Sequence, residues 1–194
     1  MKVIAMVVEV RILSRGGQGG VTGAKILAYA GHIGGKYVQA IPKYGAERKG
    51  APIYADVRIS DEKIRTHAPV IPENTHSFIV LENSEEILSQ IPFDRIKPGT
   101  IVVVNASDEP TILKDKKLKI GIVDANAISE KFGLVKSGTN LVSTIMLGAW
   151  IKATGLLSIE SLTKAIEEKF GDSEIGIKNK EAIIEAYNTL TYVN

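Results

Sequence analysis

Residues 7–30, VVEVRILSRGGQGGVTGAKILAYA, decide the fold of this 194-residue chain. The first part is rich in β-branched residues and predicts a strand over 7–13. Gly16 to Gly20 then turn the chain, and apolar residues recur at helical spacing, which predicts a helix over 21–30. A strand, a glycine loop and a helix in this order are typical of the first unit of an α/β domain.

The rest of the pattern repeats this alternation as far as residue 138. Strands are predicted over 37–41, 53–59, 77–81, 100–104 and 118–123, and helices over 84–90 and 124–132, the latter with Asp124 as its N-cap. The last three strands are continuously apolar, as in strands buried on both faces, whereas 53–59 alternates with period two, as in a half-exposed edge strand. We therefore predict a three-layer, Rossmann-like α/β fold with a mainly parallel sheet and helices on both faces.

From residue 139 the pattern changes to three consecutive helices. The first is apolar nearly all round to Ile151 and should be buried, with Gly148 permitting close approach of another helix, and with Thr139 or Asn140 as its N-cap. Ser158 should cap the second helix. We expect a single domain over 1–194, with an α/β core over about 1–138 and a helical part over about 139–194.

Composition limits the chemistry of the chain. It has no cysteine, which excludes disulfides, cysteine-ligated zinc and cysteine-held iron–sulfur clusters on this chain. Its three histidines lack metal-ligand spacing, so we expect no metal site. The longest apolar run is well short of the roughly 20 residues that span a bilayer, so we expect a cytoplasmic protein with no membrane partner.

Positive charge is concentrated around the glycine loop. Residues 1–60 contain nine Lys and Arg residues against three Asp and Glu residues, although the whole chain has a formal net charge of only +2. Such asymmetry attracts an anionic ligand or an acidic partner. The excess is modest beside that of a dedicated nucleic-acid domain, so we expect no nucleic-acid partner.

The glycine loop has the composition of a phosphate site. Backbone N–H groups at a helix N-terminus bind anions, and glycine lets a phosphate come close. A nicotinamide site is disfavoured because Thr22 stands where the Rossmann fingerprint has glycine, and a P-loop is excluded because Ala24 and Ile26 flank Lys25. We expect the phosphate contacts to come from Gly17, Gln18, Gly19, Gly20, Thr22 and Lys25. The alternative, that the glycines only form a tight turn and let the helix pack on the strand, stays open.

A second candidate segment is the loop over 42–52, which prolines bound at both ends. Its side chains offer three cations and an aromatic face, from Lys43, Tyr44, Arg48 and Lys49. If the flanking strands are neighbours, this loop lies near the glycine loop. A solvated surface loop with an incidental Glu47 salt bridge is the alternative. The residues show no complete catalytic set, and Glu82 and Asp108 are as easily turn formers as acid–base groups.

Three segments together carry a family resemblance. Residues 15–22 (RGGQGGVT), 35–42 (GKYVQAIP) and 44–52 (YGAERKGAP), with 64–70 (IRTHAPV), 146–149 and 153–156, resemble the gamma subunits of 2-oxoacid:ferredoxin (acceptor) oxidoreductases and the equivalent domain of single-chain pyruvate:ferredoxin oxidoreductases. The form of residues 44–48 looks more like the pyruvate and 2-ketoisovalerate members than the 2-oxoglutarate members.

The resemblance implies a subunit of an enzyme that converts a 2-oxoacid and coenzyme A to acyl-CoA, CO2 and reduced ferredoxin. It implies that this chain is inactive alone and helps to hold coenzyme A, with thiamine diphosphate and [4Fe-4S] clusters on partner subunits. The implied partners are the alpha, beta and delta subunits, and ferredoxin through the complex. Two alternatives stay open: a free-standing dinucleotide-binding oxidoreductase and a purely structural assembly subunit.

Overall fold

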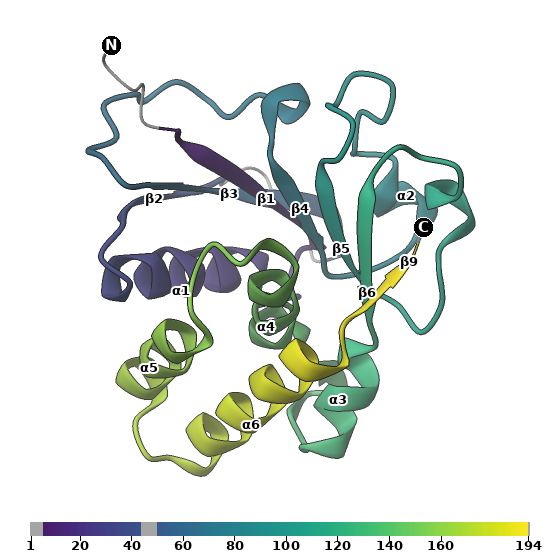
Figure 1. The fold of residues 1–194 in the computed structure, drawn as a ribbon. Helices are drawn as coiled ribbons and strands as arrows, with labels where there is room; N and C mark the ends of the chain where they lie inside the picture. Colours follow the sequence, from purple (N-terminus) through teal and green to yellow (C-terminus); the bar gives the residue numbers. More distant parts are fainter. Residues whose placement is uncertain (1–5, 44–49, 194) are drawn as a thin grey trace.

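The sheet has seven strands in the order β2-β3-β1-β4-β5-β6-β9 in the computed structural model, which describes residues 6–43 and 50–193 (Figure 1). The strands are β1 (Val8–Arg15), β2 (Tyr37–Pro42), β3 (Pro52–Ser60), β4 (Ser77–Val80), β5 (Ile101–Asn105), β6 (Lys119–Val123) and β9 (Thr191–Val193). β1, β4, β5 and β6 form the parallel centre, while β3 and β9 pair antiparallel with β1 and β6. β2 pairs antiparallel with β3 and forms one edge of the sheet, and β9 forms the other.

Helices lie on both faces of the sheet, as the sequence pattern predicts, but in unequal layers (Figure 1). The first face carries α1 (Gly20–Ile33), α3 (Ala125–Lys131), α4 (Val142–Thr154), α5 (Ile159–Phe170) and α6 (Glu174–Thr189). The second face carries the short α2 (Glu85–Leu88) and two 3-10 turns, Pro72–Asn74 and Thr111–Leu113. None of the described helices is both long and apolar enough to cross a membrane.

Helix α4 organises the first layer. All residues from Val142 to Ile151 are buried, which confirms the prediction of a helix that is apolar nearly all round. The indole N–H of Trp150 donates to Ser77 Oγ at 2.9 Å, so the one polar atom of this large side chain is satisfied at the start of β4. Gly148 faces the backbone of α6, where a Cβ would press against the carbonyl oxygen of Ile183. The lack of a side chain at Gly148 therefore allows the two helices to touch.

Several helix boundaries follow the predicted caps, and one does not. Asp124 and Ser158 cap α3 and α5 by accepting backbone N–H groups at 2.9 and 3.2 Å. The prediction that Thr139 or Asn140 caps the next helix is wrong. Those two residues form β8 (Thr139–Asn140), which pairs with β7 (Val135–Lys136), and α4 begins only after Leu141. The local pairing satisfies their backbone groups before the helix starts.

The prediction that 53–59 is a half-exposed edge strand is also wrong, although its alternation is correct. β3 lies between β2 and β1, and its polar residues Asp56 and Arg58 are only 3% and 2% exposed. Arg11 pairs with Asp56 at 2.7 Å, and Arg58 pairs with Glu9 at 2.8 Å, on the second face of the sheet. Period-two alternation indicates that two faces differ in polarity, but it does not show that the polar face meets water.

Replacing Gly148 with alanine should destabilise the protein, because the new methyl group would force α4 away from α6. We expect a loss of about 1–3 kcal/mol in the free energy of unfolding, measured by urea denaturation. Gly23→Ala is the matched control, since the nearest atom to a Cβ there, the carbonyl oxygen of Ser143, is at an ordinary contact distance of 3.5 Å. That control should be neutral or slightly stabilising, because alanine is the better helix former. Equal destabilisation by both changes would contradict the packing argument.

Stability should also fall on mild acidification because of His76. Burial lowers the pKa of His76 below its ordinary value of 6.5, and the Glu9 N–H donates to its Nδ1 at 3.1 Å, which requires that this nitrogen be unprotonated. The unfolded chain therefore binds this proton at higher pH than the folded chain, so the free energy of unfolding decreases as pH falls from about 7 through 6.5 towards the lower pKa of the folded chain. Urea denaturation across this window should show the decrease. His76→Gln should reduce it, whereas His32→Gln, at an exposed position, should leave it unchanged.

Candidate functional site

The candidate site lies at the edge where the parallel strands end. The glycine loop follows β1, Glu82 and Asn83 come shortly after β4, and Asn105 ends β5. The register of β1 with β4 pairs Leu13 with Val80, which brings the residues that follow each strand to the same edge. Open α/β sheets bind their ligands outside this carboxyl edge.

The glycine loop ends in an uncapped helix N-terminus. Gly17 and Gly19 have φ angles of 98° and 84°, which favour glycine, and Gly19 is the N-cap residue of α1. The Gly23 N–H donates to the Gly19 carbonyl at 2.8 Å and closes the first turn, and within the described residues no side chain caps this end. The N–H groups of the first turn, together with the positive end of the helix dipole, are suited to bind an anion.

The same glycines also let α1 pack tightly, which supports the alternative interpretation of the loop as well. A Cβ on Gly20 would press against the hydroxyl of the buried Ser14, and a Cβ on Gly19 would lie 2.9 Å from Ser143 Oγ. Two compatible reasons therefore explain why these loop positions are glycine. The backbone of the loop needs left-handed angles, and its inner side has no room for side chains.

The predicted proximity of the two loops is confirmed for the described residues. The Gly16 N–H donates to the Ala51 carbonyl at 2.8 Å, and the Gly50 N–H donates to the Gly16 carbonyl at 3.1 Å. These bonds extend the pairing of β1 with β3 past Arg15 and Pro52. The end of the second loop therefore lies against the glycine loop.

An ion pair beneath the loop fixes its shape. Arg15 Nε donates to both carboxylate oxygens of Glu82, at 2.8 and 3.0 Å, and Arg15 Nη1 donates to the Gly50 carbonyl at 3.0 Å. Gln18 accepts from the Arg15 N–H at 2.7 Å and donates to Glu82 at 2.9 Å. Burial would raise the pKa of Glu82, but hydrogen bonds from Ser84, Arg15 and Gln18 outweigh it and lower that pKa.

Sequence reasoning treated Glu82 as a possible turn former and missed this role. The signal that could have found it is positional. Arg15 and Glu82 stand two residues beyond the paired positions Leu13 and Val80, so parallel neighbours would place them side by side. The sequence alone does not show which strands are neighbours, so the ion pair could be identified only from the strand order in the structure.

Two of the predicted cations, Lys25 and Lys43, lie in the described part of the chain. Lys25 lines a hollow of about 350 Å³ between α1 and α5, beside Tyr29 and Glu168. Lys43 donates to the Tyr54 hydroxyl at 2.6 Å and lies 4.7 Å from the centroid of that ring. Thr22 is exposed in the first turn of α1, next to the loop. The candidates Tyr44, Arg48 and Lys49 lie outside the described residues.

A cleft rich in amide side chains adjoins the loop. It has a volume of about 250 Å³ and is lined by Glu82 and by the amides of Gln18, Asn83, Asn105, Asn126 and Asn140. Asn105 is buried and holds the strand ends together, since it donates to the Leu81 carbonyl and accepts from the Ala125 N–H, both at 2.9 Å. Asn140 Nδ2 donates to Asn126 Oδ1 and Glu130 Oε1 at 3.3 and 3.2 Å, so Asn140 offers its oxygen and Asn126 its N–H groups to a neutral polar group. In the described part of the chain, no group of three or more His, Asp or Glu residues could hold a metal ion.

Sequence comparison finds one family. A family model described as pyruvate ferredoxin/flavodoxin oxidoreductase matches residues 9–189. The chain is 41% identical over 191 residues to the pyruvate/ketoisovalerate oxidoreductases common subunit gamma of Thermococcus kodakarensis, and the alignment covers 95% of this chain and 98% of that protein.

Two solved structures are similar to this fold over nearly the whole chain. Pyruvate oxidoreductase subunit PORC from Thermotoga maritima has a TM-score of 0.79 and 31% identity, with 97% of this chain and 99% of that chain covered. A 2-oxoglutarate:ferredoxin oxidoreductase from Magnetococcus marinus, with bound 2-oxoglutarate, coenzyme A and succinyl-CoA, has a TM-score of 0.76 and 22% identity. The match covers 97% of this chain and 32% of that longer chain, and it concerns the fold alone.

Removing the charge of Glu82 should loosen the glycine loop. Glu82→Gln weakens the ion pair with Arg15, so we expect several-fold faster amide hydrogen exchange at residues 16–18 and 50–51. Glu86→Gln is the matched control. Glu86 pairs with the same guanidinium at 2.7 Å, but its side chain is 59% exposed, so its loss should change exchange little. Exchange rates that respond equally to both changes would show that Glu82 does not hold the loop.

Proposed function

The chain belongs to the pyruvate ferredoxin/flavodoxin oxidoreductase family, and we propose that its glycine loop holds a phosphate group of coenzyme A within the assembled enzyme. It is the gamma subunit of a multi-subunit 2-oxoacid:ferredoxin oxidoreductase of the pyruvate synthase type. The enzyme is an oxidoreductase, and this chain acts as one subunit of it.

One observation carries the coenzyme A proposal, namely the uncapped N-terminus of α1 at the carboxyl edge of the sheet. The first turn offers N–H groups, Gly17 and Gly19 add no side chains of their own, and a Cβ on Gly17 would meet nothing within 4 Å. Coenzyme A carries a pyrophosphate and a further phosphate, which suit such a site. The coenzyme A bound in the Magnetococcus marinus enzyme, which shares this fold, agrees with the proposal.

The cleft beside the loop supports the same ligand. The pantetheine arm of coenzyme A contains amide groups that both donate and accept hydrogen bonds. The adjoining cleft is lined by the amide of Asn83, the N–H groups of Asn126 and the amide oxygen of Asn140, which together supply both donors and acceptors. In this arrangement the proposed phosphate contacts are residues 17–20 and Thr22. Lys43 lies near the adjoining strand ends, while Lys25 faces α5 instead.

The proposal extends to the division of labour in the complex. The chain has no cysteine, so the [4Fe-4S] clusters belong to partner subunits, and thiamine diphosphate is bound there too. The partners are alpha, beta and delta subunits, and electrons reach ferredoxin through the complex. In the overall reaction the 2-oxoacid loses CO2, its acyl group is transferred to the coenzyme A thiol, and two electrons are passed to ferredoxin. This chain contributes binding and orientation rather than a catalytic group.

We also propose that the 194 residues act as one domain. Helices α4 to α6 share one hydrophobic cluster with β1, β3 and α1, which supports a single core. A purely structural role for the chain is the competing proposal, and coenzyme A binding separates the two.

The test places a negative charge beside the loop. Thr22→Glu should leave the fold intact, because an acidic side chain in the first turn of a helix is favourable, but it should repel a phosphate. We expect coenzyme A affinity of the assembled complex, measured by calorimetric titration, to fall at least ~10-fold, a loss of about 1.4 kcal/mol. Thr22→Gln, similar in size and neutral, should change affinity little. Equal affinities for the Glu and Gln variants would contradict the proposal.

A further inference from the structure

An extended segment crosses the second face of the sheet between β3 and β4. We call residues 61–71 the strap (Figure 1). Three side chains from three adjacent strands donate to alternate carbonyls of the strap. The bonds are Gln39 Nε2 to Thr66 O at 3.2 Å, Arg58 Nη2 to Ala68 O at 2.7 Å, and Arg11 Nη2 to Val70 O at 3.1 Å.

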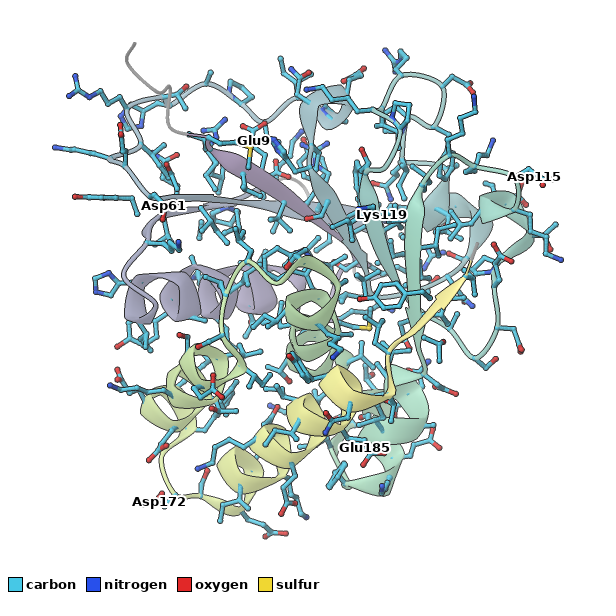
Figure 2. The ribbon with its side chains drawn as sticks, viewed as in Figure 1. Glu9, Asp61, Asp115, Lys119, Asp172 and Glu185 are labelled. Carbon is cyan, nitrogen blue, oxygen red and sulfur yellow. The ribbon has the colours of Figure 1, made fainter. Side chains whose placement is uncertain are left out.

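The arginines that hold the strap are themselves buried. Arg11 and Arg58 are 4% and 2% exposed, and their charges are balanced by Asp56 and Glu9. Figure 2 shows Glu9 on β1, on the part of the sheet that the strap covers. Buried ion pairs add little net stability over apolar side chains of the same volume. What the arginines provide here is a fixed position for the strap.

The other half of the same face uses ordinary apolar packing. There, Phe78 and Val80 of β4 and Val102 of β5 pack against Ile87 and Leu88 of α2. Apolar side chains can therefore cover this face of the sheet without buried charge. The half that contains the buried ion pairs differs because the strap covers it instead of a helix. A backbone held at three carbonyls is rigid even though it has no helix or strand of its own.

The outer side of residues 63–71 faces solvent and carries the positive charges of Lys63 and Arg65, and the exposed Glu62 directly precedes them. Residues 65–69 are exposed, and Ile71 beyond them is 53% exposed. From residue 63 to residue 71 the sequence contains no Asp or Glu, and among the described residues Lys63, Arg65 and His67 form no ion pair. Asp61, at the start of the strap (Figure 2), is already paired with Lys36 at 2.5 Å.

We propose that residues 63–71 are a docking surface for a carboxylate-bearing surface of another subunit of the same enzyme. The proposal rests on the subunit role given above and adds the location and chemistry of one contact. Cations without an internal partner favour an acidic surface, and the exposed Ile71 and Pro69 supply apolar contact beside them. Because the strap is already ordered, docking loses little conformational entropy.

The experiment reverses the charge of the strap. Lys63→Glu combined with Arg65→Glu changes exposed side chains, so the fold should persist, as circular dichroism would verify. We expect association of the variant with the partner subunits, measured by surface plasmon resonance, to weaken at least ~10-fold and to depend less on salt. The matched control is Lys114→Glu combined with Lys117→Glu, two exposed lysines of the loop before β6. Unchanged association of the strap variant, or an equal loss in the control, would overturn the proposal.

A second variant tests the rigidity of the strap without altering its surface. Gln39→Leu removes the bond to the Thr66 carbonyl and the bond that Gln39 accepts from Arg58 at 3.3 Å, and it leaves Lys63 and Arg65 in place. It should weaken association by a smaller factor than charge reversal, and it should speed amide exchange within the strap. Unchanged association together with faster exchange would overturn the claim that rigidity matters.

The two proposals fail in different ways. Thr22→Glu should lower coenzyme A affinity and leave assembly intact, whereas the strap variant should impair assembly and leave coenzyme A affinity unchanged in the complex that still forms. Failure of the unaltered chain to bind the partner subunits would contradict the subunit role itself. Normal binding of both the unaltered chain and the strap variant would contradict the docking surface alone.

Discussion

The register between β1 and β3 is the constraint on which the rest of the structure depends. It sets Glu9 opposite Arg58 and Arg11 opposite Asp56, so each directly facing pair has opposite charges. A slip of two residues would set Arg11 opposite Arg58, or Glu9 opposite Asp56, and bury like charges together. The same register brings Gly16 against Ala51 at the far end of the pair. One pairing therefore aligns both the strap and the candidate site.

The two proposed functional surfaces lie on different parts of this framework. At the carboxyl edge, the ion pair of Arg15 with Glu82 holds the glycine loop from below, so that the first turn of α1 stays open to an anion. On the second face, the buried arginines hold the strap from below, and its outer side chains face solvent. In both places a charged side chain fixes exposed backbone, through a half-buried ion pair at the glycine loop and through buried arginines at the strap. The proposed ligand site and the proposed partner surface of the gamma subunit thus depend on the same kind of support.

The sequence predicted the candidate site in part. Residues 16–20 were recognisable because glycines between a strand and a helix have a local physical meaning. The amide cleft was not recognisable, because Asn83, Asn105 and Asn140 are far apart in sequence and each has an ordinary local role. Lys25 was assigned to the loop by its closeness in sequence, yet it lies more than a turn along α1 and faces α5. Successive residues of an α-helix point in different directions around its axis, so a residue close to the loop in sequence can still face away from it.

The sequence by itself determined most helices and strands, the buried helix α4 and the protein family. These features can be read along the chain, from β-branched runs, helical periodicity, glycine positions and the motifs of residues 15–22 and 35–42. Only the tertiary structure decided which charged side chains are buried and which residues they pair with. Asp56 and Arg58 have the spacing of a solvated face, and only the strand order and the strap bury them. The reason is physical: propensity acts between near neighbours, whereas the partner of a charge depends on which strands lie side by side and in what register.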